Sequence, residues 1–394
     1  MRLFDYAKAS ALMDESGIDL VLVSSPENVG YLADYSLYIN SGHPFILDGT
    51  EQWTGRMVGL PKEEKREAFI AAISFEETLL DHYGVWIRDR RYFGPRMVYQ
   101  GRAEKHAEHT DLVNCVAEAI CERGLSEGTI AVDMAFMSAQ YYMRLRELLP
   151  KASFVDAESL LWRLRIIKSP EEIRRIRKAA QATDAAVDAA YAACYEGMPE
   201  LEFQRILKQT MVQEGTDYGW SSVAFGPKGA LLVLATEERL KPGEIVRTDA
   251  CARYQGYISD ISRVRVFGQP SDEARRAHDA IYTANRMLAE AARPGVRCCD
   301  LYQIVMAHLK KRGYESLSPQ TGHGLGRDAH EPPMLAGWNE MILEPNMIVV
   351  FEPTMRVVGV GSVNVEDMVL ITESGNEALT TSVRELVCCG VPAH

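Results

Sequence analysis

The sequence predicts an α+β protein of two domains, a smaller α/β domain over residues 1–160 and a larger domain over residues 165–394. Three observations support this prediction. The chain has 394 residues, which is long for a single domain. Its first part alternates apolar, strand-like runs with helical patterns, as a layered sheet does. Its second part contains two segments that match each other, which indicates an internal duplication.

The composition disfavours several classes of function. Apolar residues make up 47% of the chain, enough for sizeable cores. A net charge of −12 disfavours binding to nucleic acids and to anionic membrane surfaces. The chain starts with no apolar signal segment and contains no apolar run long enough to span a membrane. The eight cysteines include no Cys-x-x-Cys pair, so we expect no thiolate metal site and a reduced, cytoplasmic protein.

The predicted elements of the first domain alternate between strands and helices. Strands are expected at 18–23, 44–47, 69–73 and 129–132, and helices at 4–16, 28–35, 108–123 and 137–148. Among the histidines of this domain, His43 and His82 stand in loop-like sequence. They are therefore its better candidates to reach a substrate.

The second domain begins with a strong helix start. Ser169 is a good N-cap, Pro170 fits the first helical position, and Glu172 completes a capping box. The predicted helix runs to about residue 195. Beyond it, residues 197–215 match residues 295–313, since each segment follows an alanine-rich helix and places a helix between two glycines. The match predicts a domain with pseudo-two-fold symmetry and a site between its halves. The alternative is two unrelated helices with glycine caps.

Residues 244–265 are expected to form a β-hairpin that carries two carboxylates, Asp249 and Asp260. A two-residue loop at 254–255 would put them directly opposite each other, and a loop at 255–256 would make them diagonal neighbours on one face. In either case their Cβ atoms lie roughly 5 to 8 Å apart. Carboxylates this close repel unless one is protonated or a cation lies between them. For the hairpin alone, two solvated acids are the alternative.

Four more residues are candidates for the same site. His323 and His330 stand seven positions apart in a glycine-rich loop that ends in two prolines. Glu352 ends an apolar strand, and Glu366 lies within a predicted strand over 362–372. A carboxylate in an apolar strand is costly unless it is paired or bound to a metal. For either glutamate taken alone, a salt bridge is the alternative.

Together these segments resemble the creatinase/prolidase family of metallopeptidases, which have the pita-bread fold. The similarity spans roughly residues 165–385 and includes the stretches SDISR, HGLG, FEP and VED. It implies a catalytic domain in which pseudo-two-fold αββ repeats surround an antiparallel sheet. Residues 1–160 resemble the N-terminal domain of the family, which implies a ribonuclease-H-like α/β fold.

The resemblance also implies a site with two divalent metal ions, which would be manganese, zinc, cobalt or iron. The implied ligands are Asp249, Asp260, His323, Glu352 and Glu366. By analogy with the family, Asp249 would bind one ion and His323 and Glu352 the other, with Asp260 and Glu366 bridging. Glu352 would act as catalytic proton shuttle for a hydroxide shared by the ions, and His330 would contact the substrate or its developing oxyanion. The family commonly forms homodimers, so we expect a homodimer here.

Three departures from the family pattern bear on the substrate. Prolidases carry a histidine just upstream of the first aspartate, where this chain has Val233. An arginine is common two residues before the last glutamate and is Asn364 here. Residues 355–361 lack the tyrosines that are common in proline-specific members. The first two changes remove cationic groups that hold a peptide carbonyl or carboxylate.

We therefore expect a dinuclear metal-dependent hydrolase of C–N bonds, of the Xaa-Pro dipeptidase or aminopeptidase type, that acts on a short peptide or small molecule. The alternative is an enzyme like creatinase or ectoine hydrolase that acts on a small non-peptide substrate, which Val233 and Asn364 favour. A lyase or a non-catalytic binding module is a more distant alternative. Such relatives tend to alter the metal motif or to lose ligands, and this chain does neither.

Overall fold

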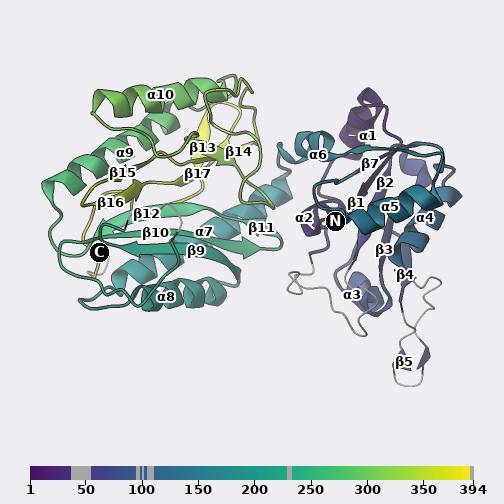
Figure 1. Cartoon of the computed structure of the whole chain (residues 1–394), viewed down its shortest axis with the longest axis horizontal. Coiled ribbons are helices and arrows are strands. Elements are labelled where there is room, and N and C mark those ends of the chain that lie inside the picture. The colour runs from purple at the N-terminus through teal and green to yellow at the C-terminus, as the bar shows by residue number, and fades with distance from the viewer. Residues whose placement is uncertain (37–54, 95–97, 100–101, 104–110, 229–232, 391–394) are drawn as a thin grey trace. The chain divides into compact units, whose positions relative to one another are not determined.

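A computed structural model describes residues 1–36, 55–94, 98–99, 102–103, 111–228 and 233–390 of the chain (Figure 1). The chain divides into two compact units, Met1–Arg165 and Ile166–His394. Each unit contains its own sheet structure and its own buried hydrophobic core.

The first unit is built on one six-stranded sheet in the order β4-β3-β2-β1-β7-β8. Strands run parallel at β3–β4, β1–β7 and β7–β8 and antiparallel at β1–β2 and β2–β3. The strands are β1 (Leu20–Val23), β2 (Met57–Pro61), β3 (Phe69–Ile73), β4 (Asp89–Phe93), β7 (Thr129–Val132) and β8 (Ser153–Asp156). A separate pair consists of β5 (Val98–Tyr99) and β6 (Arg102–Ala103). The helices are α1 (Tyr6–Glu15), α2 (Pro26–Ala33), α3 (Glu77–His82), α4 (Leu112–Glu122), α5 (Ala139–Leu148) and α6 (Glu158–Arg165).

The sequence located the buried strands of this sheet better than its edges. The strands predicted at 69–73 and 129–132 coincide with β3 and β7, and the strand predicted at 44–47 lies outside the described residues. The apolar patterns missed the buried strand β2 and also β4 and β8, which are the two edge strands of the sheet. The edge strands read DRRYF and SFVD, because an edge strand in contact with water does not need an apolar run.

The second unit contains four long helices and two four-stranded sheets. The helices are α7 (Pro170–Ala192), α8 (Glu200–Gln213), α9 (Asp272–Ala291) and α10 (Cys298–Lys311). One sheet consists of β9 (Asp217–Phe225), β10 (Ile245–Tyr254), β11 (Tyr257–Ile258) and β12 (Ile261–Val266). The other consists of β13 (Gly322–Gly324), β14 (Ile348–Phe351), β17 (Asp367–Ile371) and β18 (Asn376–Ala378), and β15 (Thr354–Val357) pairs with β16 (Gly361–Asn364). Helix α7 begins at the predicted capping box of Ser169 and Glu172.

The predicted internal duplication is visible in the order and the contacts of these elements. The succession of helix, helix and antiparallel strands occurs once from α7 to β12 and again from α9 to β17 (Figure 1). The same turn contact occurs in both halves. The N–H of Gly197 donates to the Leu240 carbonyl at 2.8 Å, and the N–H of Gly295 donates to the Leu343 carbonyl at 2.9 Å.

Each half also buries its own apolar core. Phe203 and Leu207 of α8 pack in one cluster with strands β9 and β10. Leu301 and Val305 occupy the matching positions of α10 and pack in a second cluster with strands β14 and β17. The second cluster also includes Ile245 and Val264 of the first half, so the two cores meet within the domain.

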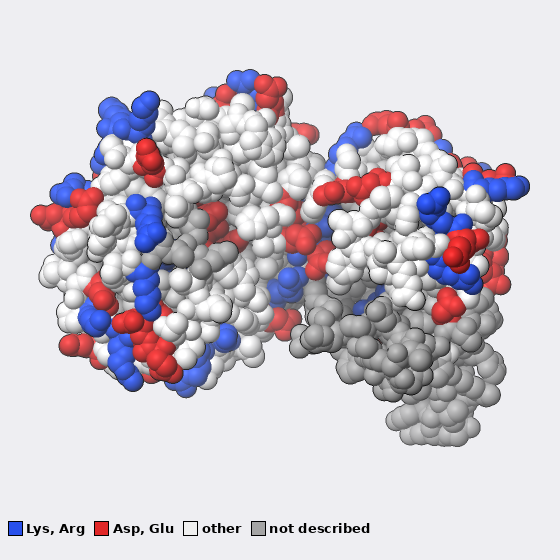
Figure 2. All heavy atoms as spheres, viewed as in Figure 1, with Lys and Arg blue, Asp and Glu red and all other residues white. Residues whose placement is uncertain are grey.

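The described part of the chain contains no helix that is both long and apolar enough to cross a membrane. Figure 2 shows basic and acidic side chains interspersed over the visible face of each unit.

Candidate metal centre

The hairpin that carries the first two carboxylates adopts the second of the two predicted registers. Its turn lies at Gln255 and Gly256, whose φ angles of 47° and 87° are those that a tight hairpin turn requires. Asp249 pairs with Ser262 across the hairpin. Asp260 stands two residues before Ser262, so the two carboxylates are diagonal neighbours across β10 and the start of β12.

The other three residues come from the second half of the domain. His323 lies in β13, Glu352 follows β14 directly, and Glu366 lies between β16 and β17. The prediction of one continuous strand over 362–372 was wrong. At Glu366 the chain leaves its pairing with β15 and joins β14, and the Glu366 N–H donates to the Ser262 carbonyl at 3.0 Å. This change of partner turns the carboxylate toward the other half.

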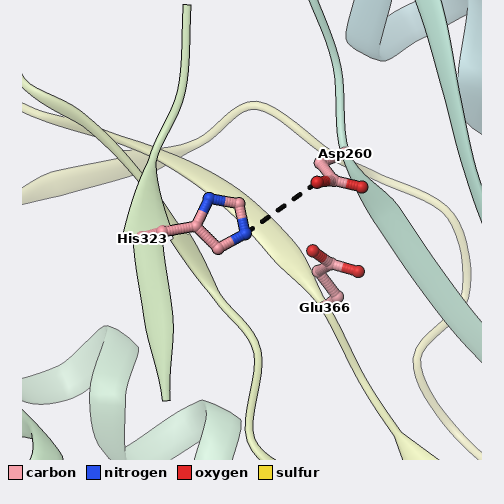
Figure 3. A group of neighbouring side chains, drawn as sticks. All are labelled: Asp260, His323 and Glu366. Atoms are coloured by element: carbon pink, nitrogen blue, oxygen red, sulfur yellow. Dashed lines mark ion pairs between the residues drawn. The ribbon is translucent and has the colours of Figure 1, made fainter. Parts of the chain in front are cut away.

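The five residues converge into two groups that share Glu366. One group is Asp260, His323 and Glu366 (Figure 3), and the other is Asp249, Glu352 and Glu366. In each group the possible ligand atoms lie within 4.8 Å of one another. His323 Nε2 lies 3.9 Å from Asp260 Oδ2 and 3.8 Å from Glu352 Oε2, so Glu352 reaches toward both groups.

Three of these carboxylates each bury an oxygen atom that has no hydrogen-bond partner among the described residues. The atoms are Oδ1 of Asp249, Oδ1 of Asp260 and Oε2 of Glu366, on side chains of residues that are at most 5% exposed. A buried polar atom without a partner is unfavourable. Divalent cations between the carboxylates would satisfy all three atoms, so the residues fit a metal site rich in oxygen ligands.

The same crowding changes the pKa values of the carboxylic acids. Burial raises the pKa of Asp260 and of Glu366 well above the usual range, and neighbouring carboxylates raise both further. Burial and the charge of Asp249 raise the pKa of Glu352 to about 8. Burial raises the pKa of Asp249 to about 6, against the lowering effect of Arg247. Without a metal ion the cluster therefore holds protons at neutral pH, and metal binding would displace them.

His323 is oriented as a neutral ligand. Its Nδ1 lies 3.0 Å from the carbonyl oxygen of Gly324, which can only accept, so Nδ1 carries the proton. The lone pair of Nε2 then faces Asp260 and Glu352. Burial, and after it the neighbouring His330, lower the pKa of His323 to about 3, so this ring stays neutral.

The loop after β13 places His330 against His323. The two ring centroids lie 4.0 Å apart. The loop is closed at Gly324, whose N–H donates to the Pro333 carbonyl and whose carbonyl accepts the N–H of Glu331, both at 2.8 Å. His330 is exposed and belongs to neither metal group. It is therefore available to a substrate.

A buried ion pair, which the sequence analysis missed, anchors this loop. The Lys168 ammonium lies 3.4 Å from Glu331, and both side chains are 1% exposed. The other oxygen of Glu331 accepts the backbone N–H groups of Arg327 and Asp328. Lys168 directly precedes the N-cap of α7, so the start of α7 and the histidine loop are held together.

The sequence analysis also missed Arg247, which lies next to the metal groups. Its guanidinium lies 2.9 Å from the Asp249 carboxylate and donates to Asn364 Oδ1 at 2.8 Å. A signal was present, since residues 247 and 249 of one strand point to the same face. Val233 is another position at which the chain departs from the family pattern. Its N–H donates to Ser222 Oγ at 2.9 Å, and Arg247 donates to the same oxygen. The departures at positions 233 and 364 therefore both lie next to Arg247.

The two histidines of the first unit remain untested as substrate contacts. His82 ends α3 in the first unit, and His43 lies outside the described residues.

A pseudo-symmetric domain with buried carboxylates and one histidine between its halves defines a metal-dependent hydrolase of the metallopeptidase class. Comparison with known proteins agrees with this. Residues 174–373 match the model of metallopeptidase family M24, and residues 6–167 match the creatinase/prolidase N-terminal domain. The chain belongs to metallopeptidase family M24, and the predicted pita-bread fold with its N-terminal domain is confirmed.

Individual relatives support the same assignment over nearly the whole chain. The sequence is 28% identical to an Xaa-Pro dipeptidase of Pyrococcus furiosus, over 96% of this chain and 98% of the relative. It is 31% identical to a putative dipeptidase of Bacillus subtilis, over 72% and 79% of the two chains. The solved structure of an Xaa-Pro dipeptidase from Bacillus anthracis matches with a TM-score of 0.83 at 25% identity, over 97% of this chain and 98% of that one.

Proposed function

We propose that the protein is a dinuclear metal-dependent hydrolase that cleaves C–N bonds of short peptides of the Xaa-Pro type. The observation that carries the proposal is that two groups of ligand atoms share Glu366. A shared carboxylate would hold two ions as neighbours. When bound, such ions acidify a water molecule and stabilise the negative charge that develops on the attacked carbonyl.

The five residues predicted from the sequence are the proposed ligands. Their grouping differs from the assignment by family analogy: Asp260, His323 and Glu366 would hold one ion, and Asp249, Glu352 and Glu366 the other. Glu352 would also lie in reach of the ion beside His323. Manganese, zinc, cobalt and iron all suit oxygen-rich ligation with one imidazole.

Two residues of the chain would handle protons and charge during the reaction. The Glu352 side chain is 19% exposed, whereas the other carboxylates are buried, so it is placed to take a proton from the attacking water and pass it to the leaving amine. His330 is exposed beside His323 and would donate a hydrogen bond to the substrate carbonyl. A general acid or base of this kind contributes typically about 10²-fold or more to the rate.

The names of the relatives favour a peptide substrate, since several of them are called Xaa-Pro dipeptidases. Two residues favour the alternative, a small non-peptide substrate. Val233 and Asn364 stand where the family carries cationic groups for the substrate, and Arg247 beside them is 1% exposed. A side chain so buried does not contact a peptide carboxylate.

The first experiment is hydrolysis of Gly-Pro and of an Xaa-Pro-Xaa tripeptide by manganese-loaded protein, with Asp260→Ala as the control. Turnover that disappears in the variant supports the proposed peptidase. Bound metal without turnover of either peptide would contradict it and favour the non-peptide alternative. N-substituted amino acids, amidines and cyclic amides would then be screened. The protein is loaded with manganese first, and zinc, cobalt and iron are then compared in the same assay.

We also propose a homodimer in the cytoplasm, on the basis of the family resemblance and the unpaired cysteines. All eight cysteines of the chain are free thiols. Light scattering at micromolar concentration tests the assembly, and a mass of one chain, 44.0 kDa, would overturn it.

A further inference from the structure

Arg247 is a deeply buried cation that pairs with one carboxylate of the proposed metal centre. It lies in β10, is 1% exposed, and is among the largest fully buried side chains of the described residues. Its three nitrogen atoms donate to residues of three different strands, β10, β16 and β9. Nη2 donates to Asp249 at 2.9 Å, Nε to Asn364 at 2.8 Å and Nη1 to Ser222 at 3.3 Å.

Burying a guanidinium is unfavourable unless its charge and its donors are matched. Here the match is the carboxylate cluster. Asp249 neutralises the charge directly, and the polar atoms of Asn364 and Ser222 accept the remaining donors that point toward them. The planar, forked shape of the guanidinium allows it to contact all three at fixed angles, which a lysine cannot do.

Asn364, which accepts a hydrogen bond from Arg247, relates this arrangement to the family pattern. The residue is 0% exposed and occupies the position, two before Glu366, at which an arginine is common in the family. Its Oδ1 accepts from Arg247, while its Nδ2 has no partner among the described residues. The guanidinium of this chain thus comes from β10, in one half of the domain, to meet the asparagine on β16, in the other half.

We propose that Arg247 supplies, from strand β10, a guanidinium in place of the one that relatives carry at position 364, and that here it is a positioning residue for Asp249 in metal binding and does not contact the substrate. The inference rests on the proposed dinuclear site. Arg247 fixes one oxygen of Asp249, and the other oxygen, Oδ1, has no hydrogen-bond partner among the residues that the structure describes. The fixed carboxylate therefore presents Oδ1 to the ion.

The consequence is selective for one of the two ligand groups. Arg247 donates directly to Asp249, which belongs to only one of the two groups. Without the guanidinium, Asp249 loses its partner and stays close to two other carboxylates of its group. We expect its carboxylate to turn away from the position that presents Oδ1 to the ion. The ion of the Asp249 group should then be lost, while the ion of the Asp260 group remains.

The test measures bound manganese by elemental analysis after dialysis and by calorimetric titration. In Arg247→Met we expect loss of one ion per chain, that of the Asp249 group, and retention of the other. In the double variant Arg247→Met/Asn364→Arg, which returns the guanidinium to the family position, we expect both ions to be bound again. Arg247→Lys keeps the charge without the fork and should weaken the same ion by about tenfold or more.

Arg265→Met is the matched control. Arg265 is also buried in this sheet, at 5% exposed, and pairs with Asp188 away from the metal groups. This variant should lose stability and keep both ions.

Each outcome decides the proposal. Both ions bound with wild-type affinity in Arg247→Met, or in Arg247→Lys if the first variant does not fold, would overturn the positioning role. A folded double variant, with the wild-type circular dichroism spectrum, that fails to regain the ion would overturn the replacement of the family arginine. If the wild-type protein binds only one ion, or none, the proposed dinuclear site fails instead, and the two failures are distinguishable.

Discussion

The imidazole rings of His323 and His330 lie with their centroids 4.0 Å apart. Among the ion pairs of the described residues, only those of His323 bring a carboxylate oxygen within 4 Å of a ring nitrogen of this histidine pair. The two rings are therefore expected to do different work. His323 would hold an ion, and His330 would face the substrate.

Replacement of His330 should consequently separate activity from metal binding. We expect His330→Gln to retain both ions and to lose about 10²-fold or more in kcat, because a general acid or oxyanion donor is removed while the ligands stay in place. His323→Gln should lose metal as well as activity. Metal analysis and steady-state kinetics on the two variants check this, and loss of metal in His330→Gln would refute the division of roles.

Asp260→Ala should abolish both metal binding and hydrolysis. Asp260 is buried, and one of its oxygens has no hydrogen-bond partner in the described part of the chain. Asp300→Ala is the matched control, because Asp300 lies in the first turn of α10, pairs with the exposed Arg297 and belongs to neither metal group. An Asp260→Ala protein that is active without metal would disprove the site assignment.

The metal-free protein should lose stability as the pH rises. The pKa of Glu352 is raised to about 8 and that of Asp249 to about 6 in the folded state, above the values of the unfolded chain. At a pH between its unfolded-state pKa and its folded-state pKa, each group holds a proton in the folded protein that it has released in the unfolded chain. The free energy of unfolding therefore falls as the pH rises. Thermal unfolding of the metal-free protein from about pH 5 to about pH 8, a range that includes both pKa values, checks this. A melting temperature that rises with pH would contradict it.

Metal binding should show the opposite dependence. Because ions displace the retained protons, apparent affinity rises with pH until Glu352 has ionised, near a pKa of about 8. Calorimetric titration in buffers of different ionisation enthalpy measures the released protons directly. Proton uptake on binding would be incompatible with the buried, protonated cluster.

Gly324→Ala should disturb the histidine loop. An added Cβ at this position would lie 2.4 Å from the Pro332 carbonyl oxygen, a backbone atom that cannot move alone. We expect a loss of about 2 kcal/mol or more in the free energy of unfolding and weaker metal binding, because the Gly324 carbonyl orients His323. Gly375→Ala is the control, since its Cβ would meet no atom within 4 Å. Equal stability of the two variants would contradict this account of the loop.

The sequence by itself determined the class of fold and the candidate residues of the site. The helix starts, the matching segments at 197–215 and 295–313, and the five residues from Asp249 to Glu366 were all readable, because they depend on local periodicity or on motifs. The N-cap of Ser169 and the hairpin around Gly256 follow from local backbone preferences in the same way.

The tertiary structure alone decided which groups meet. The sequence left the register of the hairpin open and placed Glu366 inside a strand, whereas the structure puts it at a change of strand partner. The ion pair of Lys168 with Glu331 and the contact of Arg247 with Asn364 join residues 163 and 117 positions apart. No local pattern reports such contacts, because their free energy depends on burial and on charges that only the packed halves of the domain bring together.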